Sequence, residues 1–288
     1  MMSPESSVTL ERRLLWHSCS VEGDTRVIDH LAALLPDAHH PVPVLRELHY
    51  DVADTADGFA ITEEGDALAT VATAEEAADV VHVRAHRRAF ELASLSGWAR
   101  LHAATVDLAT VEGRRVRVLV VGPSGAGKTT LATRLLLDGA DVQGDESVLV
   151  RRAASLAVPR ALHLKPGAAV VLPELAAVLP ELPVIGEVTV LDPARVDRPV
   201  TLRIAPVAHV VVLAGPRHEP ADASEGVTCT PIDGGAVLEA LLTDAFPLTE
   251  TKARMVSVLA GAMVSARGHR LTAGPPDAMV EALRGAIR

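Results

Sequence analysis

The stretch Gly122–Thr129, which reads Gly-Pro-Ser-Gly-Ala-Gly-Lys-Thr, constrains the fold of this chain more than any other part of the sequence. It fits the phosphate-loop pattern of a glycine, four residues and then Gly-Lys-Thr. The apolar, β-branched run 116–121 precedes it, as expected of a buried strand. Leucines at helical spacing follow it, and Gly139 is placed to end that helix. Because strand, loop and helix occur in the required order, the sequence predicts a nucleoside triphosphate site.

The residue types of this loop suit phosphate binding. Glycines let the backbone wrap its N–H groups around an anion at a helix N-terminus, which carries partial positive charge. Lys128 is predicted to reach the β- and γ-phosphates, and the Thr129 hydroxyl to ligate Mg²⁺. The alternative is a glycine-rich turn with a solvated lysine. The predicted nucleotide-binding residues are Gly122, Pro123, Ser124, Gly125, Ala126, Gly127, Lys128, Thr129 and Thr130.

Two adjacent acids, Asp145 and Glu146, follow the loop and its helix. We expect the stretch 140–150 to be a strand or strand end that carries these acids, followed by another strand. Side chains alternate along an extended segment, so neighbouring acids point to opposite sides and can take different roles. One carboxylate beside Thr129 would complete a Mg²⁺ shell, and the other would accept a proton from an attacking hydroxyl or water. Thr129, Glu146 and Asp145 are therefore the candidate metal ligands. The alternative is an acidic turn between two strands.

In this order, the motifs resemble the catalytic domain of the HPr kinase/phosphorylases. They are more similar still to the HPr-kinase-like proteins that lack the N-terminal domain of that enzyme. The matching segments are Leu101–Asp107, the loop itself and Gly139–Glu146. Pro159–Gly167 is also similar to a recurrent segment of the group, and the likeness spans roughly residues 98–170.

The resemblance implies an α/β fold, a P-loop kinase domain of the HPr kinase and phosphoenolpyruvate carboxykinase type. Such a domain has a mixed central sheet flanked by helices, and we assign it to residues 98–288. Hairpin signals at Asp57-Gly58 and Glu64-Gly65, followed by a helix start at Thr73, predict a small N-terminal α+β subdomain over residues 1–97.

The resemblance further implies transfer of a phosphoryl group from ATP to a hydroxyl, usually that of a serine. By position, Asp145 takes the acid/base role, His102 the supporting role beside it, and Lys128 with Thr129 the phosphate and Mg²⁺ roles. A histidine entering a buried strand has the alternative role of a hydrogen-bonded core residue. Arg160, or else Lys165, would stabilise charge on the transferring group, unless both are surface cations. The predicted catalytic residues are Asp145, His102, Lys128 and Arg160.

The overall composition narrows the class of protein. The net charge of −10 argues against nucleic acid or an anionic membrane as the main partner. No apolar stretch approaches the length of a membrane span, and the first ten residues lack a signal-peptide core. The two cysteines, Cys19 and Cys229, offer neither a disulfide framework nor metal spacing, so we expect a cytoplasmic location.

Several other segments carry structural expectations. The helix that starts at Thr73 is predicted to run to Leu95 and bears a basic cluster, either a solvated face or a contact for an acidic substrate or a neighbouring subunit. The proline-rich stretch 173–199 reads as a long loop, with a lid over the site as one role. A core strand is expected at 208–213, ending at Gly215-Pro216, then a mobile tract at 216–226. Three helices are expected near 235–244, 249–267 and 277–288.

Together these features predict an ATP- and Mg²⁺-dependent kinase. The predicted phosphoacceptor is a hydroxyl, with serine as the expected type, on a peptide, a small protein or a small metabolite. The alternative is a regulatory nucleotide-binding or nucleotide-hydrolysing protein without a phosphoacceptor. A homo-oligomer is left open, as are the nucleotide base and the identity of the acceptor. HPr itself does not follow as the substrate, because the chain has no clear counterpart of the later Glu-Ile-Arg-Gly segment of the true HPr kinases.

Overall fold

The N-terminal part of the chain forms a five-stranded sheet in the order β1-β2-β3-β4-β5. The computed structural model describes residues 7–214, 226–243, 245 and 252–287. All neighbouring strands of this sheet are antiparallel except β2 and β3, which are parallel and joined through helix α1. The elements are β1 Val8–Leu14, β2 His17–Gly23, α1 Thr25–Leu34, β3 Arg46–Thr55, β4 Gly58–Glu63 and β5 Asp66–Val71. The predicted hairpins lie at β3–β4 and β4–β5, with Gly58 and Gly65 at positive φ.

Helix α2, Ala74–Leu95, follows as predicted and begins with a capping box between Thr73 and Glu76. Its buried face is rich in alanine and packs against α1 and the sheet. The expectation of a solvated basic face is wrong for two of its arginines. Arg84 and Arg88 both donate hydrogen bonds to Glu63 at the end of β4, and these bonds lower the pKa of Glu63 to about 2. The helix lies over the face of the sheet to which Glu63 points, so these cations are drawn inward.

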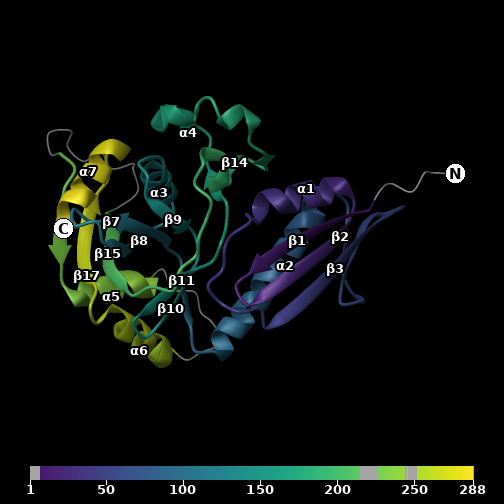
Figure 1. The fold of residues 1–288 in the computed structure, drawn as a ribbon, viewed down its shortest axis with the longest axis horizontal. Helices are drawn as coiled ribbons and strands as arrows, with labels where there is room; N and C mark the ends of the chain where they lie inside the picture. Colours follow the sequence, from purple (N-terminus) through teal and green to yellow (C-terminus); the bar gives the residue numbers. More distant parts are fainter. Residues whose placement is uncertain (1–6, 215–225, 244, 246–251, 288) are drawn as a thin grey trace.

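A mixed six-stranded sheet forms the second part of the chain, on the left of Figure 1, in the order β16-β17-β15-β8-β7-β9. The strands β8, β15 and β17 run parallel to one another. Strand β7 pairs antiparallel with both β8 and β9, and β16 pairs antiparallel with β17. The strands are β7 Ala104–Ala109, β8 Arg115–Val121, β9 Asp141–Gly144, β15 Val207–Ala214, β16 Cys229–Ile232 and β17 Arg267–Thr272. A mixed sheet is therefore confirmed.

Helices cover both faces of this sheet. Leucines of α3, Lys128–Leu137, pack with α7, Pro276–Ala286, on one face. The helices α5, Gly234–Thr243, and α6, Lys252–Met263, contribute to the apolar cluster on the other face. The helix predicted over 249–267 ends early, because strand β17 begins at Arg267 and needs a connection of its own. The predicted turn at Gly215-Pro216, nearly all of the predicted mobile tract and the predicted helix residues 244, 249–251 and 288 lie outside the described residues.

Two smaller sheets join these parts. Strand β10, Val148–Arg151, pairs with β6, Ala99–Leu101, and with β11, Ala154–Ala157. Strand β14, Val188–Leu191, pairs with β12, Leu162–Leu164, and with β13, Val184–Ile185. The stretch 173–199 is thus only partly a loop, since it holds a hairpin and three short 3₁₀ helices. Its role as a lid stays a prediction.

The apolar core of the first sheet extends beyond residue 97. Leu149, Leu156 and Val158, from the segment around β10 and β11, belong to the same buried cluster as the inner faces of α1, α2 and β1–β4. Val200 and Leu202 join it from further along the chain. The division into subdomains at residue 97 stays a prediction, and the packing across it is continuous.

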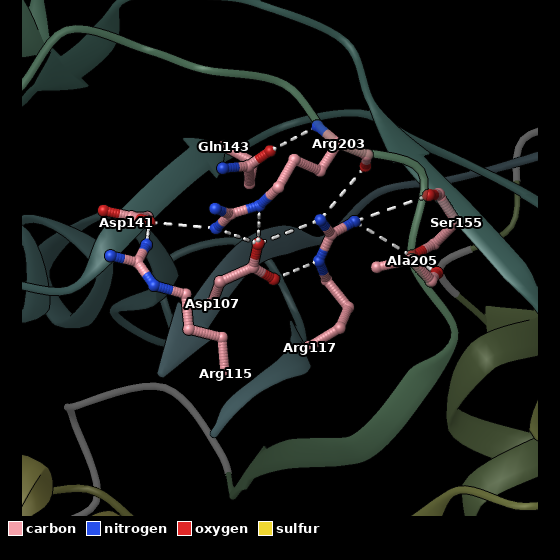
Figure 2. Close-up of polar contacts among 8 residues, drawn as sticks. All are labelled: Asp107, Arg115, Arg117, Asp141, Gln143, Ser155, Arg203 and Ala205. Carbon is pink, nitrogen blue, oxygen red and sulfur yellow. Dashed lines mark hydrogen bonds and ion pairs between the residues drawn. The ribbon is translucent and has the colours of Figure 1, made fainter. Parts of the chain in front are cut away.

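An ion network ties the six-stranded sheet to β11 (Figure 2). The fully buried Arg117 of β8 pairs with Asp107 of β7 and donates to the Ser155 hydroxyl at 3.1 Å. Arg203 donates to Asp107 at 2.7 Å and to Asp141 of β9 at 2.9 Å. Because β8 leads directly into Gly122, this network fixes the strand that carries the glycine-rich loop.

Among the described residues, none of the helices has both the length and the apolar character needed to cross a membrane. Cys19 is buried and Cys229 partly buried, and both are free thiols.

Candidate functional site

The loop between β8 and α3 has the backbone conformation that its glycines permit. Gly122, Gly125 and Gly127 have φ values of +148°, +83° and +100°. A Cβ at Gly122 would come within 3.1 Å of the Leu213 Cβ and 3.2 Å of the Leu213 carbonyl oxygen on β15. No side chain caps the start of α3 at Gly127. A helix N-terminus of this kind carries partial positive charge and can bind an external anion.

Lys128 does not extend into solvent. Its side chain is buried, and its ammonium donates to the carbonyl oxygens of Gly122 and, at 3.3 Å, of Pro123. The alternative of a solvated lysine in a glycine-rich turn is therefore wrong. The ammonium lies against the carbonyls at the start of the loop, where it adds to the positive potential of the loop amides.

Asp145 lies beside the loop. Asp145 directly follows β9 and is only 6% exposed. Its carboxylate accepts a hydrogen bond from the Thr129 hydroxyl. Burial raises the pKa of Asp145 above its usual value, although the Thr129 hydroxyl and the positive charges of Arg160 and Lys128 act in the opposite direction. The structure thus brings the first predicted acid to the predicted phosphate loop.

Glu146 has different partners from Asp145, as the alternation of side chains predicts. Its carboxylate forms an ion pair with Arg160, and Arg160 also donates from Nη2 to the His163 Nδ1 at 3.1 Å. His102 lies between β6 and β7, and not within a strand, and its Nδ1 donates to the backbone carbonyl of Glu146 at 3.1 Å. His102 therefore positions the backbone of the acidic pair.

These groups line one pocket of about 420 Å³. Most of the predicted site residues lie in its wall: His102, Ser124, Gly125, Gly127, Lys128, Thr129, Thr130, Asp145 and Glu146. The rest of the lining is the segment 163–168 with Val171, Leu172 and Val188. Four predicted residues are not part of this lining. Gly122 and Pro123 lie at the start of the loop, Ala126 is packed in the apolar core, and Arg160 stands behind Glu146.

Some residues of the pocket were not among those predicted from the sequence. His163, Gly167 and Val188 line it, and Lys165 does so as well, although the sequence offered it only as an alternative to Arg160. The available signal was the segment Pro159–Gly167, whose resemblance to a recurrent family segment pointed to the neighbourhood of the site. Val188 is brought in by the β12–β14 pairing, which has no local sequence signature.

The donor set suits a nucleotide and a magnesium ion. Backbone N–H groups and an ammonium complement phosphate, and a threonine hydroxyl beside a carboxylate offers the hard oxygen ligands that Mg²⁺ prefers. Of the three predicted metal ligands, Thr129 and Asp145 are in direct contact, whereas the carboxylate of Glu146 is neutralised by Arg160.

Comparison with known proteins places few constraints on this site. No protein-family model matches the chain, and no curated protein matches its sequence. Among solved structures, the chain is similar to the Hpr(Ser) kinase/phosphatase from Coxiella burnetii, with 11% sequence identity and a TM-score of 0.33. That match covers 65% of this chain and 95% of the other.

Proposed function

We propose that this chain is an ATP- and Mg²⁺-dependent kinase that transfers the γ-phosphoryl group to a hydroxyl of a peptide, a small protein or a small metabolite, with serine as the expected acceptor. The observation that carries the proposal is the position of Asp145. Its buried carboxylate contacts Thr129, one residue after the lysine of the glycine-rich loop. A carboxylate next to a phosphate cradle is what a kinase needs and a purely structural loop does not.

The loop amides and Lys128 hold the phosphates in this proposal. The Lys128 ammonium exchanges its contacts with the Gly122 and Pro123 carbonyls for phosphate oxygens. The Thr129 hydroxyl and the carboxylate of Glu146 would hold Mg²⁺, with Asp145 as the alternative carboxylate ligand. The metal, when bound, neutralises charge that develops on the phosphates.

Asp145 acts as the general base. A pKa that burial has raised brings the carboxylate closer to that of an effective base near neutral pH. It accepts the proton of the acceptor hydroxyl as that oxygen attacks the γ-phosphorus, while the bond from that phosphorus to the β,γ-bridging oxygen breaks and ADP leaves. His102 holds the backbone of Glu146 and so keeps the acidic pair in place. Arg160 would stabilise charge on the transferring group once its pair with Glu146 is exchanged.

Transfer of label from γ-labelled ATP to hydroxyl-bearing peptides and metabolites tests this function. Asp145→Asn is expected to reduce transfer by at least about a hundredfold, since a general base is removed. Binding of magnesium nucleotide, measured by calorimetry, should persist. Asp66→Asn, an exposed change on β5, is the control and should leave both unchanged.

Two results would contradict the proposal in different ways. Absence of any heat with magnesium nucleotides would refute the nucleotide site itself. Release of free phosphate with every acceptor tried, and no labelled product, would instead favour a nucleotide-hydrolysing regulatory protein.

A further inference from the structure

A second cavity, of about 900 Å³, adjoins the Asp145 pocket. Helix α2 forms one wall, with His82, His86 and Phe90 among its lining residues. Arg100, Ser147 and Arg160 belong to the facing wall. The cavity is therefore built from both parts of the chain, the helix of the N-terminal part and the segments that carry the acidic pair.

Arg160 separates the two cavities. Its guanidinium lines the second cavity, yet it pairs with Glu146 and contacts His163 in the lining of the first. Ser147, in the second cavity, directly follows Glu146 in the chain. A molecule bound in the second cavity is thus one side chain away from the pocket of Asp145.

Two guanidinium groups give one end of the second cavity a positive potential. Arg100 donates to the Ser147 hydroxyl at 2.8 and 3.0 Å, and its Cζ lies 3.9 Å from the centre of the Phe90 ring. Burial is the main cause that lowers the pKa of Arg100 to about 10, and repulsion from the positive charge of Arg160 adds to it. An anion bound between them would relieve that repulsion.

Hydrogen-bonding capacity is also left over here. Among the described residues, the buried Nε of Arg160 and the buried Nε2 of His82 have no hydrogen-bond partner. The other charged groups of the lining are Asp79 and the ion pair between Arg87 and Glu91, and burial keeps His82 and His86 neutral by lowering their pKa values.

The remainder of the lining is apolar. Val158 contributes from the wall opposite α2, and Phe90 lies under Arg100. Val83 and Leu95 are 63% and 85% exposed, although both line the cavity. Exposed apolar side chains that border a cavity of this size suit the body of a bound organic molecule.

We propose that this cavity binds an amphipathic organic anion, with its carboxylate or phosphate between Arg100 and Arg160 and its apolar body along α2, and that this anion is part of the phosphoacceptor. The last clause rests on the proposed kinase function. The acceptor is then a compound with a hydroxyl and an acidic group. Its acidic group is held beside Arg160, between the two cavities, and its hydroxyl extends toward Asp145.

A matched series of eight-carbon probes tests the binding site without nucleotide: octanoate, octyl phosphate, octanol and octylammonium, by titration calorimetry. Octanoate or octyl phosphate should bind at one site, and comparison of the two distinguishes a carboxylate from a phosphate preference. Octylammonium should bind at least about tenfold more weakly, because its charge is repelled by both arginines. Equal affinity for octanol, octylammonium and the two anions would overturn the proposal.

Two variants locate the probe. Arg100→Gln and Val83→Glu should each weaken the better anion at least about tenfold. Val83 is exposed, so its variant is expected to fold even where Arg100→Gln does not. Val111→Glu is the matched control, since Val111 is 93% exposed in the β7–β8 turn and is not among the residues that line the cavity. Wild-type affinity in both test variants would overturn the site.

The link to the acceptor has its own readout. In a transfer assay, the better anion should compete with the acceptor and not with ATP. Normal probe binding without such competition would refute the acceptor clause alone. If the wild-type protein transfers no phosphoryl group to any acceptor but still binds the probe, the result would count against the kinase function and would still support the anion site.

Discussion

The carboxylate of Glu146 is paired with the guanidinium of Arg160 at the partition between the two cavities. The carboxylate oxygen that pairs with Arg160 cannot at the same time bind a metal ion, which is the role predicted for Glu146. Binding of Mg²⁺ through Glu146 therefore has to compete with this ion pair, and it would release Arg160 toward the phosphoryl group or the anion.

This competition predicts opposite effects for two variants on the magnesium dependence of nucleotide binding. Glu146→Gln removes a carboxylate ligand and should raise the half-saturating Mg²⁺ concentration about tenfold or more. Arg160→Gln frees that carboxylate and should lower the half-saturating concentration a few-fold, while transfer becomes slower. Calorimetric titrations at graded Mg²⁺ measure both. A shift of both variants in the same direction would exclude Glu146 as a ligand that competes with Arg160.

The glycine at the start of the loop should be required for nucleotide binding. A Cβ at Gly122 meets Leu213, and φ is +148°, so Gly122→Ala should displace the loop and weaken magnesium nucleotide binding at least about tenfold. Gly113→Ala is the matched control. Gly113 has a φ of +76°, but no atom of the described residues lies within 4 Å of an added Cβ, so that change should cost about 1 kcal/mol of stability and leave nucleotide affinity as in the wild type. Equal affinity losses in the two variants would contradict this.

Asp145 should lower the stability of the protein at neutral pH. Its folded-state pKa is raised by burial, so its contribution is most favourable below the unfolded-state pKa and is lost as pH rises through the folded-state value. Asp145→Asn cannot ionise and should therefore be more stable than the wild type at about pH 8, with a difference that shrinks toward about pH 4. Urea unfolding across that range measures the difference. A variant that becomes less stable relative to the wild type as pH rises would show that the carboxylate is stabilised by its neighbours.

The buried ion network should stabilise the protein only while each charge in it keeps its partner. Asp107→Asn leaves Arg117 with a weakened partner in a site from which water is excluded, so unfolding should become easier by about 3–5 kcal/mol. Glu112→Gln is the control, because the Glu112–Arg114 pair is 3.2 Å long and exposed on both sides. That change should cost less than about 0.5 kcal/mol. Similar costs for the two, in denaturant titrations, would mean that the network is dispensable.

The local parts of the site could be predicted from the sequence. The strand, glycine-rich loop and helix around Lys128 form a continuous pattern, and the strand end with Asp145 and Glu146 follows it at short range. Each of these elements is decided by residues near one another in the chain, so spacing and residue type were sufficient.

Contacts between distant segments could not be predicted. Arg203 lies 96 residues from Asp107, and nothing in the pattern around either residue indicates their pairing. The arginines of α2 suggested a solvated face because helical spacing does not reveal that Glu63 of β4 lies beneath them. The early end of α6 has the same origin, since the strand that follows it is fixed by pairing with β15.

The shared apolar cluster has a consequence for attempts to divide the protein. Leu149, Leu156 and Val158 follow residue 97 in the sequence, yet they belong to the apolar core of the N-terminal sheet. A fragment that stops at residue 97 would lack these side chains and expose a hydrophobic surface to water, so it should aggregate when produced alone. For the same reason, neither half can be exchanged as an independent module between proteins unless the segment of β10 and β11 is transplanted with it.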